Sequence, residues 1–238
     1  MIYKNMKFKV LVSAPALQPI LEEYREIFNS HQIETIVPPL KENLSEEELL
    51  EYAKDIDGII CGNDEITARV ISSAPRLKVI SKWGTGTDSI DKEAAARRGI
   101  PVKNTPNAFT EPVADTVLSF ILCFARDTIN LNEKVRRGIW GRKLNPSLNE
   151  CTLGVVGVGN IGRAVIKRAK AFGMKILAND IKEIPGHDLV PLEQLLKESD
   201  FVSLNCDLNP TSRYLINKEK IALMKPPAYL INTARGPI

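Results

Sequence analysis

The stretch from Leu153 to Gly162 constrains the fold of this chain more than any other. It reads Leu-Gly-Val-Val-Gly-Val-Gly-Asn-Ile-Gly, an apolar run typical of a β-strand that breaks into the spacing G-x-G-x-x-G. In this spacing Gly157 allows a tight turn, Gly159 lets the backbone approach a bound pyrophosphate, and Gly162 lets the next helix pack against the strand. The pattern predicts a dinucleotide site at a helix N-terminus, where free N–H groups bind anions.

The residues after the glycines support this prediction over an ordinary glycine turn without a cofactor. Gly173 stands where a left-handed helix C-cap belongs, and the strand-like residues 175–179 then lead into Asp180. Apolar residues at helical spacing precede that cap, at Ile161, Val165, Ala169 and Phe172. Asp180 is the expected acceptor for the adenosine ribose hydroxyls. Its charge would repel a 2′-phosphate, which favours NAD over NADP, while the nearby Lys182 leaves NADP open.

Composition excludes several classes of protein. The chain has 238 residues and a formal net charge of +3, with basic and acidic residues evenly mixed, which argues against a nucleic acid or membrane partner. The longest apolar stretch, residues 117–125, falls short of the roughly 20 residues that span a bilayer. The basic clusters are expected to be solvated faces; they contain Arg136, Arg137, Arg142, Lys143, Arg163, Lys167 and Arg168. Four cysteines without metal or C-x-x-C spacing predict reduced core residues of a cytoplasmic protein: Cys61, Cys123, Cys151 and Cys206.

The first hundred residues alternate strand-like and helix-like pieces, which predicts a parallel α/β sheet. The expected strands are 9–13, 33–37, 58–61, 77–81 and 100–103. One helix is expected over 17–29, and another begins at the capping box Ser45-x-x-Glu48. The later helix, about Pro112 to Asp127, is apolar nearly all round, so we expect it to be buried between domains or between subunits.

A second βα series begins at residue 151. Its expected strands are 152–157, 175–179, 201–205 and 229–232, separated by helices near 161–172, 192–198 and 218–224. Two complete mononucleotide-binding halves have six strands, so we expect the chain to stop inside its second domain. Ligands bind at the carboxyl ends of such strands, and we expect the fourth strand to neighbour the first across the switch point. Arg235, at the carboxyl end of the fourth strand, would then face the cofactor crevice.

Two further segments contain groups that could bind or polarise a substrate. The loop from Trp83 to Asp91 could expose successive backbone N–H groups at its glycines to a carboxylate. The segment from Leu230 to Gly236 delivers Arg235, whose planar guanidinium can bind a carboxylate and polarise a carbonyl. An ordinary glycine turn and a surface arginine are the alternatives for these two segments.

Taken together, these segments resemble the D-isomer-specific 2-hydroxyacid dehydrogenases, the family that includes D-3-phosphoglycerate dehydrogenase, over essentially the whole chain. The order of motifs carries the resemblance: Gly84-x-Gly86-x-Asp88, Asn104-Thr105-Pro106-Asn107, Val113-Ala114-Asp115 (the family usually has Glu in place of Asp115), Arg137-x-x-Trp140, and Asn232-Thr233-Ala234-Arg235-Gly236. The resemblance implies a flavodoxin-like substrate domain over residues 1–105, lacking its C-terminal return segment. It implies a Rossmann NAD-binding domain over 106–238, also incomplete. The implied activity is hydride transfer between NAD(H) and a small 2-hydroxy or 2-oxo acid, in a homodimer.

The resemblance also implies a role for each matching residue. Arg235 is the catalytic residue, and the substrate carboxylate is bound by Gly84, Thr85 and Gly86. In the family this loop and the arginine face each other across a cleft between the domains. The implied cofactor-binding residues are Gly157, Gly159, Asn160, Ile161, Gly162, Asp180, Cys206, Thr211 and Thr233. No metal is implied.

The sequence departs from the family in several places. Asn205 stands where the family usually has His, and Gly62 stands where phosphoglycerate-specific relatives tend to carry an Arg for the substrate phosphate. The family donates the proton through a His held by a carboxylate, both on segments after the arginine strand. His31 and His187 match neither position. We therefore expect a truncated dehydrogenase that binds its cofactor without turning over alone.

Two other functions stay open at this stage. Some relatives of the family are non-catalytic, NAD-sensing corepressors that recruit partner peptides, and this chain could be such a binding protein. A Rossmann-like methyltransferase is the second alternative. If the chain were such a methyltransferase, the positions of Asp180 and Arg235 would both be coincidences.

Overall fold

The computed structural model describes residues 7–141 and 144–238, so two residues of the predicted basic clusters, Arg142 and Lys143, lie outside the described residues. The chain divides into two compact units, the first ending at Ala108 and the second beginning at Phe109. The division expected from the sequence, between residues 105 and 106, lies close to this point. No helix in the described ranges is long and apolar enough to cross a membrane.

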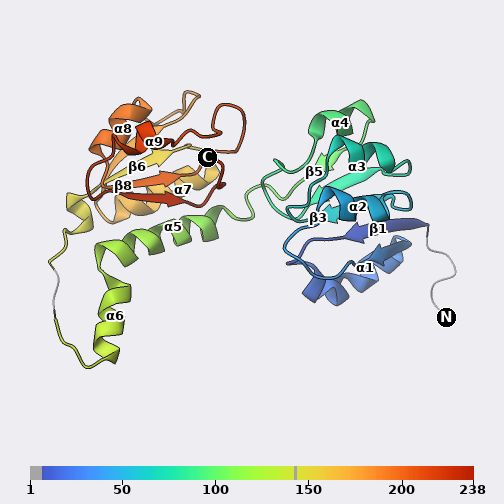
Figure 1. Ribbon diagram of the computed structural model, residues 1–238, viewed down its shortest axis with the longest axis horizontal. Helices are drawn as coiled ribbons and strands as arrows, with labels where there is room; N and C mark the ends of the chain where they lie inside the picture. The colour runs from blue at the N-terminus through green and yellow to red at the C-terminus, as the bar shows by residue number, and fades with distance from the viewer. Residues whose placement is uncertain (1–6, 142–143) are drawn as a thin grey trace. The chain divides into compact units, whose positions relative to one another are not determined.

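The first unit is a parallel sheet in the order β2-β1-β3-β4-β5 (Figure 1). Its strands are β1 (Phe8–Val12), β2 (Ile33–Ile36), β3 (Gly58–Cys61), β4 (Val79–Lys82) and β5 (Val102–Lys103). This order confirms the flavodoxin-like prediction, because the strands after β2 are added on the opposite side of β1. The carboxyl ends of β1, β3 and β4 are consecutive along one edge of the sheet.

Over residues 7–108, five short helices accompany this sheet: η1 (Gln18–Tyr24, a 3₁₀ helix), α1 (Arg25–Ser30), α2 (Glu46–Ala53), α3 (Ala68–Ser73) and α4 (Lys92–Arg97). The prediction of one helix over 17–29 is wrong, since η1 and α1 divide that segment. Neither η1 nor α1 contains a fully buried residue. Packing of an apolar face supplies most of the stability of a protein helix, so little here enforces one continuous α-helix.

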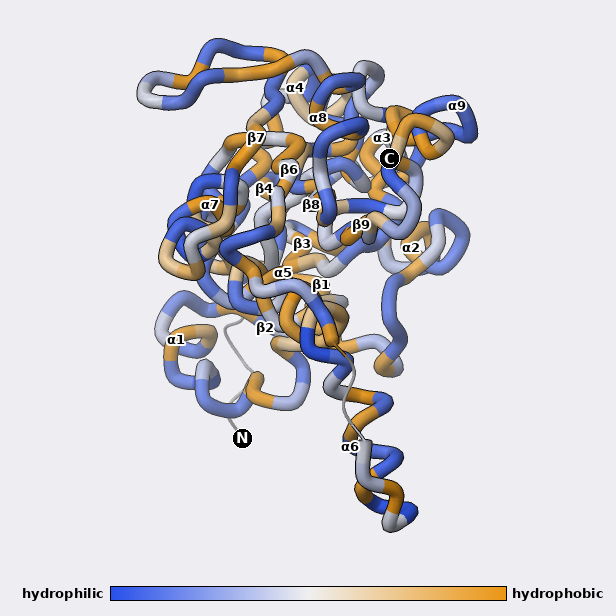
Figure 2. Tube along the Cα trace, turned by 90° about the vertical axis from the view of Figure 1, so that its left-hand side faces the viewer, coloured by the Kyte–Doolittle hydropathy of each residue, from blue (hydrophilic) through white to orange (hydrophobic). Residues whose placement is uncertain are grey.

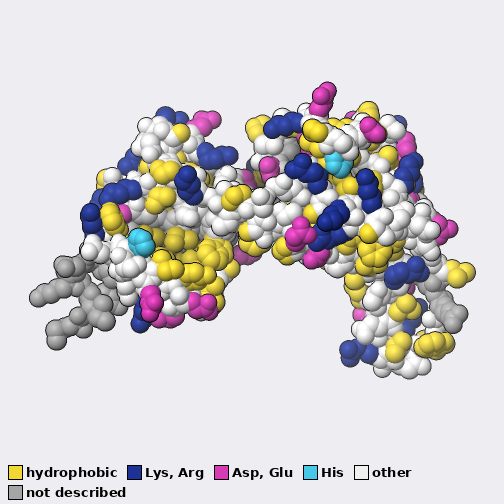
Figure 3. All heavy atoms as spheres, turned by 180° about the vertical axis from the view of Figure 1, so that it is seen from behind, with side chains coloured by type: hydrophobic (Ala, Val, Ile, Leu, Met, Phe, Trp, Pro, Cys, Tyr) yellow, Lys and Arg dark blue, Asp and Glu magenta, His cyan; other side chains and the backbone are white. Residues whose placement is uncertain are grey.

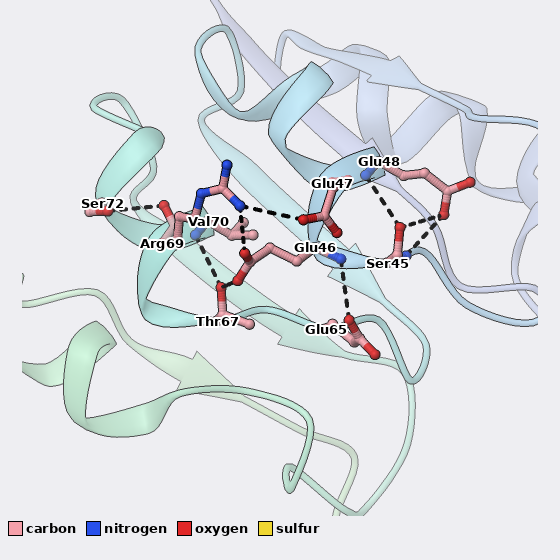
Figure 4. Close-up of polar contacts among 9 residues, drawn as sticks. All are labelled: Ser45, Glu46, Glu47, Glu48, Glu65, Thr67, Arg69, Val70 and Ser72. Carbon is pink, nitrogen blue, oxygen red and sulfur yellow. Dashed lines mark hydrogen bonds and ion pairs between the residues drawn. The ribbon is translucent and has the colours of Figure 1, made fainter.

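The predicted capping box at the start of α2 is confirmed. Ser45 Oγ accepts from the Glu48 N–H (3.4 Å), and the Glu48 carboxylate accepts from the Ser45 N–H (3.0 Å). Next to the box, the Glu46 carboxylate accepts from the Thr67 hydroxyl and from Arg69 Nη1, which lies at 2.9 Å (Figure 4). Thr67 is the N-cap of α3. These contacts tie the N-termini of α2 and α3 together.

The second unit is a parallel sheet in the order β7-β6-β8-β9. Its strands are β6 (Thr152–Val156), β7 (Lys175–Asn179), β8 (Phe201–Leu204) and β9 (Tyr229–Asn232). The expectation that the fourth strand neighbours the first is wrong, because β8 takes that place and β9 pairs with β8. The connecting helix α8 (Leu192–Glu198) packs tightly on β6: a Cβ on Gly154 would lie 2.4 Å from Leu195 Cδ2. The chain therefore returns beside β6 with its third strand.

The remaining helices of this unit are α5 (Thr110–Ala125), α6 (Thr128–Arg136), η2 (Leu148–Glu150), α7 (Asn160–Ala171) and α9 (Lys218–Ile221). The expectation that the α5 segment is buried between domains or between subunits stays a prediction, because within this unit only one face of the helix is buried. Val117 and Ile121 are fully buried, whereas Phe120 and Phe124 are 43% and 46% exposed. The Phe124 ring stacks on Tyr229 at a centroid distance of 4.6 Å. One face of α5 packs on α7, so its opposite face is left on the surface of this unit.

The prediction of a solvated basic face on α7 is wrong for Arg168. Its Nη2 lies 2.6 Å from Glu111 and its Nε lies 2.7 Å from Asp115, and the side chain is only 23% exposed. Arg168 is in the last turn of α7 and Glu111 is in the first turn of α5, where their charges match the helix dipoles. Asp115, which replaces the usual Glu of the family, thus helps to hold α7 against α5.

Each of the two units has, within itself, the same kind of hydrogen bond at the amino ends of its strands. Asp57 precedes β3, and its carboxylate accepts from the Lys9 N–H in β1 (3.0 Å). Asp200 precedes β8, and its carboxylate accepts from the Thr152 N–H in β6 (2.8 Å). Each carboxylate also binds a lysine. Both units therefore fasten their first and third strands in the same way.

Candidate functional site

The glycine turn after β6 leaves no room for larger residues at two positions. Gly157 has a φ of 88°, in the left-handed region, and its N–H donates to Asn179 O at the end of β7 (2.8 Å). A Cβ on Gly157 would lie 2.6 Å from the Cys206 nitrogen in the loop after β8. A Cβ on Gly162 would lie 2.0 Å from Gly157 O. These contacts bring the start of α7 directly against the turn.

The N-terminus of α7 presents hydrogen-bond donors to open space. Gly159 has no heavy atom within 4 Å of the position that a Cβ would take. The N–H groups of Gly159, Ile161 and Gly162 donate to no acceptor in the described part of the chain. Asn160 is the first residue of the helix. Unpartnered N–H groups and the helix dipole give this end a positive potential, as an anion-binding site requires.

Asp180 follows β7 and lies beside the glycine turn. Its Oδ2 accepts from the Val158 N–H (2.7 Å), and its Oδ1 accepts from the Lys182 N–H (3.0 Å). A carboxylate has about four lone-pair sites, so each oxygen can still accept from a ribose hydroxyl. Sequence reasoning missed the contact with Val158, through which Asp180 also holds the glycine turn.

The other three cofactor candidates have different surroundings. Thr233, just after β9, has a buried hydroxyl without a partner among residues 7–141 and 144–238, as a ligand-binding group would. Cys206 follows β8; burial raises the pKa of its thiol, and the charges of Asp207 and Asp180 raise it further. Thr211 is exposed, and its N–H and hydroxyl donate to Asn209 Oδ1 (2.8 and 2.6 Å). The structure thus places Thr233 and Cys206 at strand ends and Thr211 farther along a loop.

Arg235 lies in a turn that the Asn232 side chain closes. Asn232 Oδ1 accepts from the Ala234 N–H (3.0 Å), and Asn232 Nδ2 donates to Arg235 O (2.9 Å). The same carbonyl accepts from the Ile238 N–H (3.1 Å). The Arg235 guanidinium donates to Ala234 O (2.9 Å) and is partly exposed. Sequence reasoning missed Asn232, although Asn at the start of a turn is a known signal for such side-chain bonds.

The predicted substrate loop follows β4 in the first unit. Gly84 has a φ of 154°, and the N–H groups of the next three residues, Thr85, Gly86 and Thr87, donate to no acceptor in the described ranges. The Thr85 carbonyl accepts from Asn104 Nδ2 (2.7 Å), which fixes the loop. Successive unpartnered N–H groups form a concave anion-binding geometry.

The two histidines have local contacts. His31 Nδ1 lies 2.9 Å from Ile27 O and 3.1 Å from Ser30 Oγ, at the end of α1. His187 lies in the loop after β7, where its N–H donates to Ile184 O (3.1 Å). Among the described residues, no three His, Cys, Asp or Glu side chains gather as metal ligands.

Comparison with known proteins places these features in one family. Residues 118–238 match the sequence model of the D-isomer specific 2-hydroxyacid dehydrogenase, NAD binding domain. A glyoxylate reductase of Thermococcus onnurineus is 36% identical over 98% of this chain and 73% of its own length. A D-3-phosphoglycerate dehydrogenase of Methanocaldococcus jannaschii is 39% identical over 96% of this chain, and the chain spans only 44% of that relative.

A solved structure extends the similarity to the fold. The D-lactate dehydrogenase of Aquifex aeolicus, complexed with NAD and lactic acid, matches with a TM-score of 0.87. It is 30% identical in sequence, and the match covers 96% of this chain and 69% of that one.

Proposed function

This chain belongs to the D-isomer-specific 2-hydroxyacid dehydrogenases, which are NAD-dependent oxidoreductases, and from that premise we propose a division of roles between its two units. The second unit holds NAD(H) at the glycine turn and contributes Arg235. The first unit contributes the loop of Gly84, Thr85 and Gly86. The reaction is reversible hydride transfer to a small, unphosphorylated 2-oxo acid.

The contacts around the glycine turn support the part of this proposal that concerns NAD(H) binding. The N–H groups of Gly159, Ile161 and Gly162 and the start of the helix at Asn160 would hold the pyrophosphate, while Gly157 shapes the turn. Asp180 would accept from the adenosine ribose, and Thr233 would donate its unpartnered hydroxyl to the bound cofactor, with Cys206 and Thr211 beside it. NAD supplies a carbon centre that accepts or donates hydride. The protein supplies fixed donors that bind and orient it.

The chemistry of a 2-oxo acid suits Arg235 and the loop after β4. The substrate carries a planar carboxylate, and its carbonyl oxygen gains negative charge as the carbon is reduced. A guanidinium offers paired N–H donors that can bind the carboxylate and polarise the carbonyl. The N–H groups of Thr85 and Gly86 offer further neutral donors to the carboxylate.

The surroundings of Gly62 support an unphosphorylated substrate. A Cβ on Gly62 would lie 2.9 Å from Pro15 Cδ, so an arginine at this position would require the Pro15 ring to shift. A phosphate group binds best to paired cationic donors. Without an arginine here, we propose that glyoxylate, pyruvate or hydroxypyruvate fits better than a phosphorylated acid.

Binding measurements test this function directly. We expect the chain to bind NADH by calorimetry and then to bind oxamate, an unreactive 2-oxo acid analogue, more tightly than it binds 3-phosphoglycerate. Binding of NADH without any binding of oxamate would favour the NAD-sensing alternative. Binding of neither ligand would contradict the proposal altogether.

We also propose that the chain forms a homodimer through α5 and α6. α6 contains no buried residue, and it extends from the end of α5 away from the sheet of its unit (Figure 1). Large apolar side chains lie exposed along it and just after it: Ile129 (61%), Val135 (60%), Ile139 (52%) and Trp140 (83%). Hydrophobic segments alternate with polar ones along α6 in Figure 2, and hydrophobic side chains reach the surface of this projection in Figure 3. A second copy of this chain would cover them.

The state of the cysteines is relevant to the cellular compartment of the protein. All four are free, with Cys61 and Cys151 buried and Cys123 and Cys206 partly buried. Unpaired thiols in cores are typical of reducing compartments, and we propose a cytoplasmic location on this ground.

A further inference from the structure

Lys82, the last residue of β4, is a buried cation in the first unit that the proposed chemistry does not use. It is only 3% exposed. Its ammonium donates to Gly62 O and to Asn63 Oδ1, which lies at 2.6 Å, both in the loop after β3. Its aliphatic stem runs under the next loop, because a Cβ on Gly84 would lie 3.2 Å from Lys82 Cε. Lys82 therefore contacts the loops at the carboxyl ends of two neighbouring strands.

A buried carboxylate holds the other side of the loop after β3. Asp64 is fully buried and accepts from the Gly62 N–H (2.9 Å), the Ser13 hydroxyl (2.7 Å) and the Leu44 N–H (2.6 Å). The peptide groups of Gly62 are thus bound by Asp64 at the N–H and by Lys82 at the carbonyl. Burial raises the pKa of the Cys61 thiol to about 12; the positive charge of Lys82 lowers this pKa and the negative charge of Asp64 raises it.

The lysine also determines which group Asn63 turns outward. An ammonium only donates hydrogen bonds, so it requires the amide oxygen of Asn63 on its side. The two N–H donors of that amide then point away from the ammonium, on an exposed side chain. The Asn63 amide therefore offers uncharged N–H donors at this edge of the sheet, although the Lys82 ammonium is buried next to it.

We propose that Lys82 is a positioning residue for substrate binding, which holds the Gly84 loop and the outward-facing Asn63 amide in the geometry that receives the 2-oxo acid. The proposal rests on the substrate role given above to Gly84, Thr85 and Gly86. It makes the ammonium act through the two loops, without touching the substrate.

The experiment uses Trp83 as a local reporter. The chain has two tryptophans, and a Trp140→Phe background leaves Trp83, between Lys82 and Gly84, as the only one. In this background, oxamate is titrated into the NADH-saturated protein while Trp83 emission and calorimetric heat are recorded. The variants are Lys82→Met, Lys82→Arg and Asn63→Asp, and the control is Lys92→Met, at an exposed lysine on α4. Urea unfolding is measured for each protein.

We expect Lys82→Met to weaken oxamate binding at least tenfold and to shift Trp83 emission, while the Kd for NADH, which binds the second unit, stays within twofold. Lys82→Arg should restore most of the oxamate affinity, because a cationic donor is regained. Asn63→Asp keeps an oxygen for Lys82 but adds an outward negative charge, so it should also weaken oxamate binding without changing the urea midpoint. Lys92→Met should change nothing.

Two results would overturn the inference in different ways. Wild-type binding of oxamate in both Lys82→Met and Asn63→Asp would remove Lys82 from substrate positioning and leave the proposed function intact. If Lys82→Met does not fold, the exposed Asn63→Asp variant decides alone. Binding of NADH but not of oxamate by the unaltered chain would remove the proposed substrate site, and the role of Lys82 with it.

Discussion

At the scale of single residues, Asp180 has two roles, of which the sequence indicates only one. Its position after β7 predicts a contact with the ribose, and the structure adds a hydrogen bond from the Val158 N–H inside the glycine turn. The carboxylate that we propose disfavours a 2′-phosphate therefore also stabilises the glycine turn.

Replacing Asp180 with Asn should relax cofactor selectivity. Asn keeps an oxygen for the Val158 N–H but loses the charge, whose repulsion of a 2′-phosphate amounts to a few kcal/mol. We expect the ratio of the Kd values for NADPH and NADH to fall by roughly tenfold or more. Calorimetry with both cofactors measures this ratio, and Asp188→Asn, at an exposed carboxylate in the following loop, is the control. An unchanged ratio would show that Asp180 does not select the cofactor.

Arg235 offers a second test at this scale. Lysine keeps the charge but not the planar, paired donors of a guanidinium, so Arg235→Lys should weaken oxamate binding by roughly tenfold or more. The Kd for NADH should change little, because the glycine turn is untouched. Arg213→Lys, at an exposed arginine of the same unit, provides the matched control. The assignment fails if NADH binding is lost while oxamate binding survives.

At the scale of elements, the turn between β6 and α7 contains a glycine that we expect folding to require, Gly162, and a glycine that we propose for cofactor binding, Gly159. Gly162→Ala places a Cβ 2.0 Å from Gly157 O, whereas Gly159→Ala meets no atom within 4 Å. We expect Gly162→Ala to lower the free energy of unfolding by about 1–3 kcal/mol.

Gly159→Ala should unfold at the wild-type urea concentration and yet bind NADH more weakly, because its methyl group occupies the space proposed for the pyrophosphate. Urea unfolding and calorimetry on the two variants distinguish the effects. Equal NADH affinity in Gly159→Ala and wild type would place the pyrophosphate elsewhere.

The carboxylate that fastens β1 to β3 predicts a pH dependence. Burial raises the pKa of Asp57, but the Lys9 N–H, Lys78 and Arg76 together outweigh it, so the pKa lies below the ordinary value of 3.8. The stability that these contacts add is therefore fully present above pH 3.8 and is lost as the pH falls through the lower pKa of the folded state.

Asp57→Asn should cost about 1–3 kcal/mol of unfolding free energy at pH 7. The difference from wild type should shrink below pH 4, where the native carboxylate begins to take up a proton. Urea unfolding between pH 3 and 8 measures it, with the exposed Asp55→Asn as control. A difference that stays constant down to pH 3 would contradict the assignment.

At the scale of the whole molecule, the exposed apolar residues around α6 predict association. Trp140→Glu should convert a dimer into a monomer, because a charge cannot be buried in an apolar interface without a partner. Light scattering at micromolar concentration measures the mass. Ile221→Glu, at an equally apolar site on α9 that is 53% exposed, should leave the dimer intact. A monomeric wild-type chain would exclude the proposed interface.

Much of the fold and part of the candidate site follow from sequence patterns that act locally. The strands 58–61, 175–179 and 229–232 and the helix 192–198 have the predicted bounds, and the Ser45 capping box and the left-handed Gly173 are present. Phe172, which the helical spacing groups with Ile161, Val165 and Ala169, is 46% exposed, because it is the C-cap residue, at the end of the packed face. Short segments such as α3 and α4 were missed because six residues carry little periodicity.

The sequence by itself determined the order of the strands along the chain, the glycine turn and the family, because each depends on neighbouring residues whose spacing is readable. Only the tertiary structure decided that β8 rather than β9 lies beside β6, that Arg168 binds Asp115, and that Asn232 closes the turn of Arg235. It alone revealed the charges of Asp64 and Lys82 around Gly62. Such contacts join residues on different elements, and burial makes each of them strong, yet no local pattern records which charges will meet.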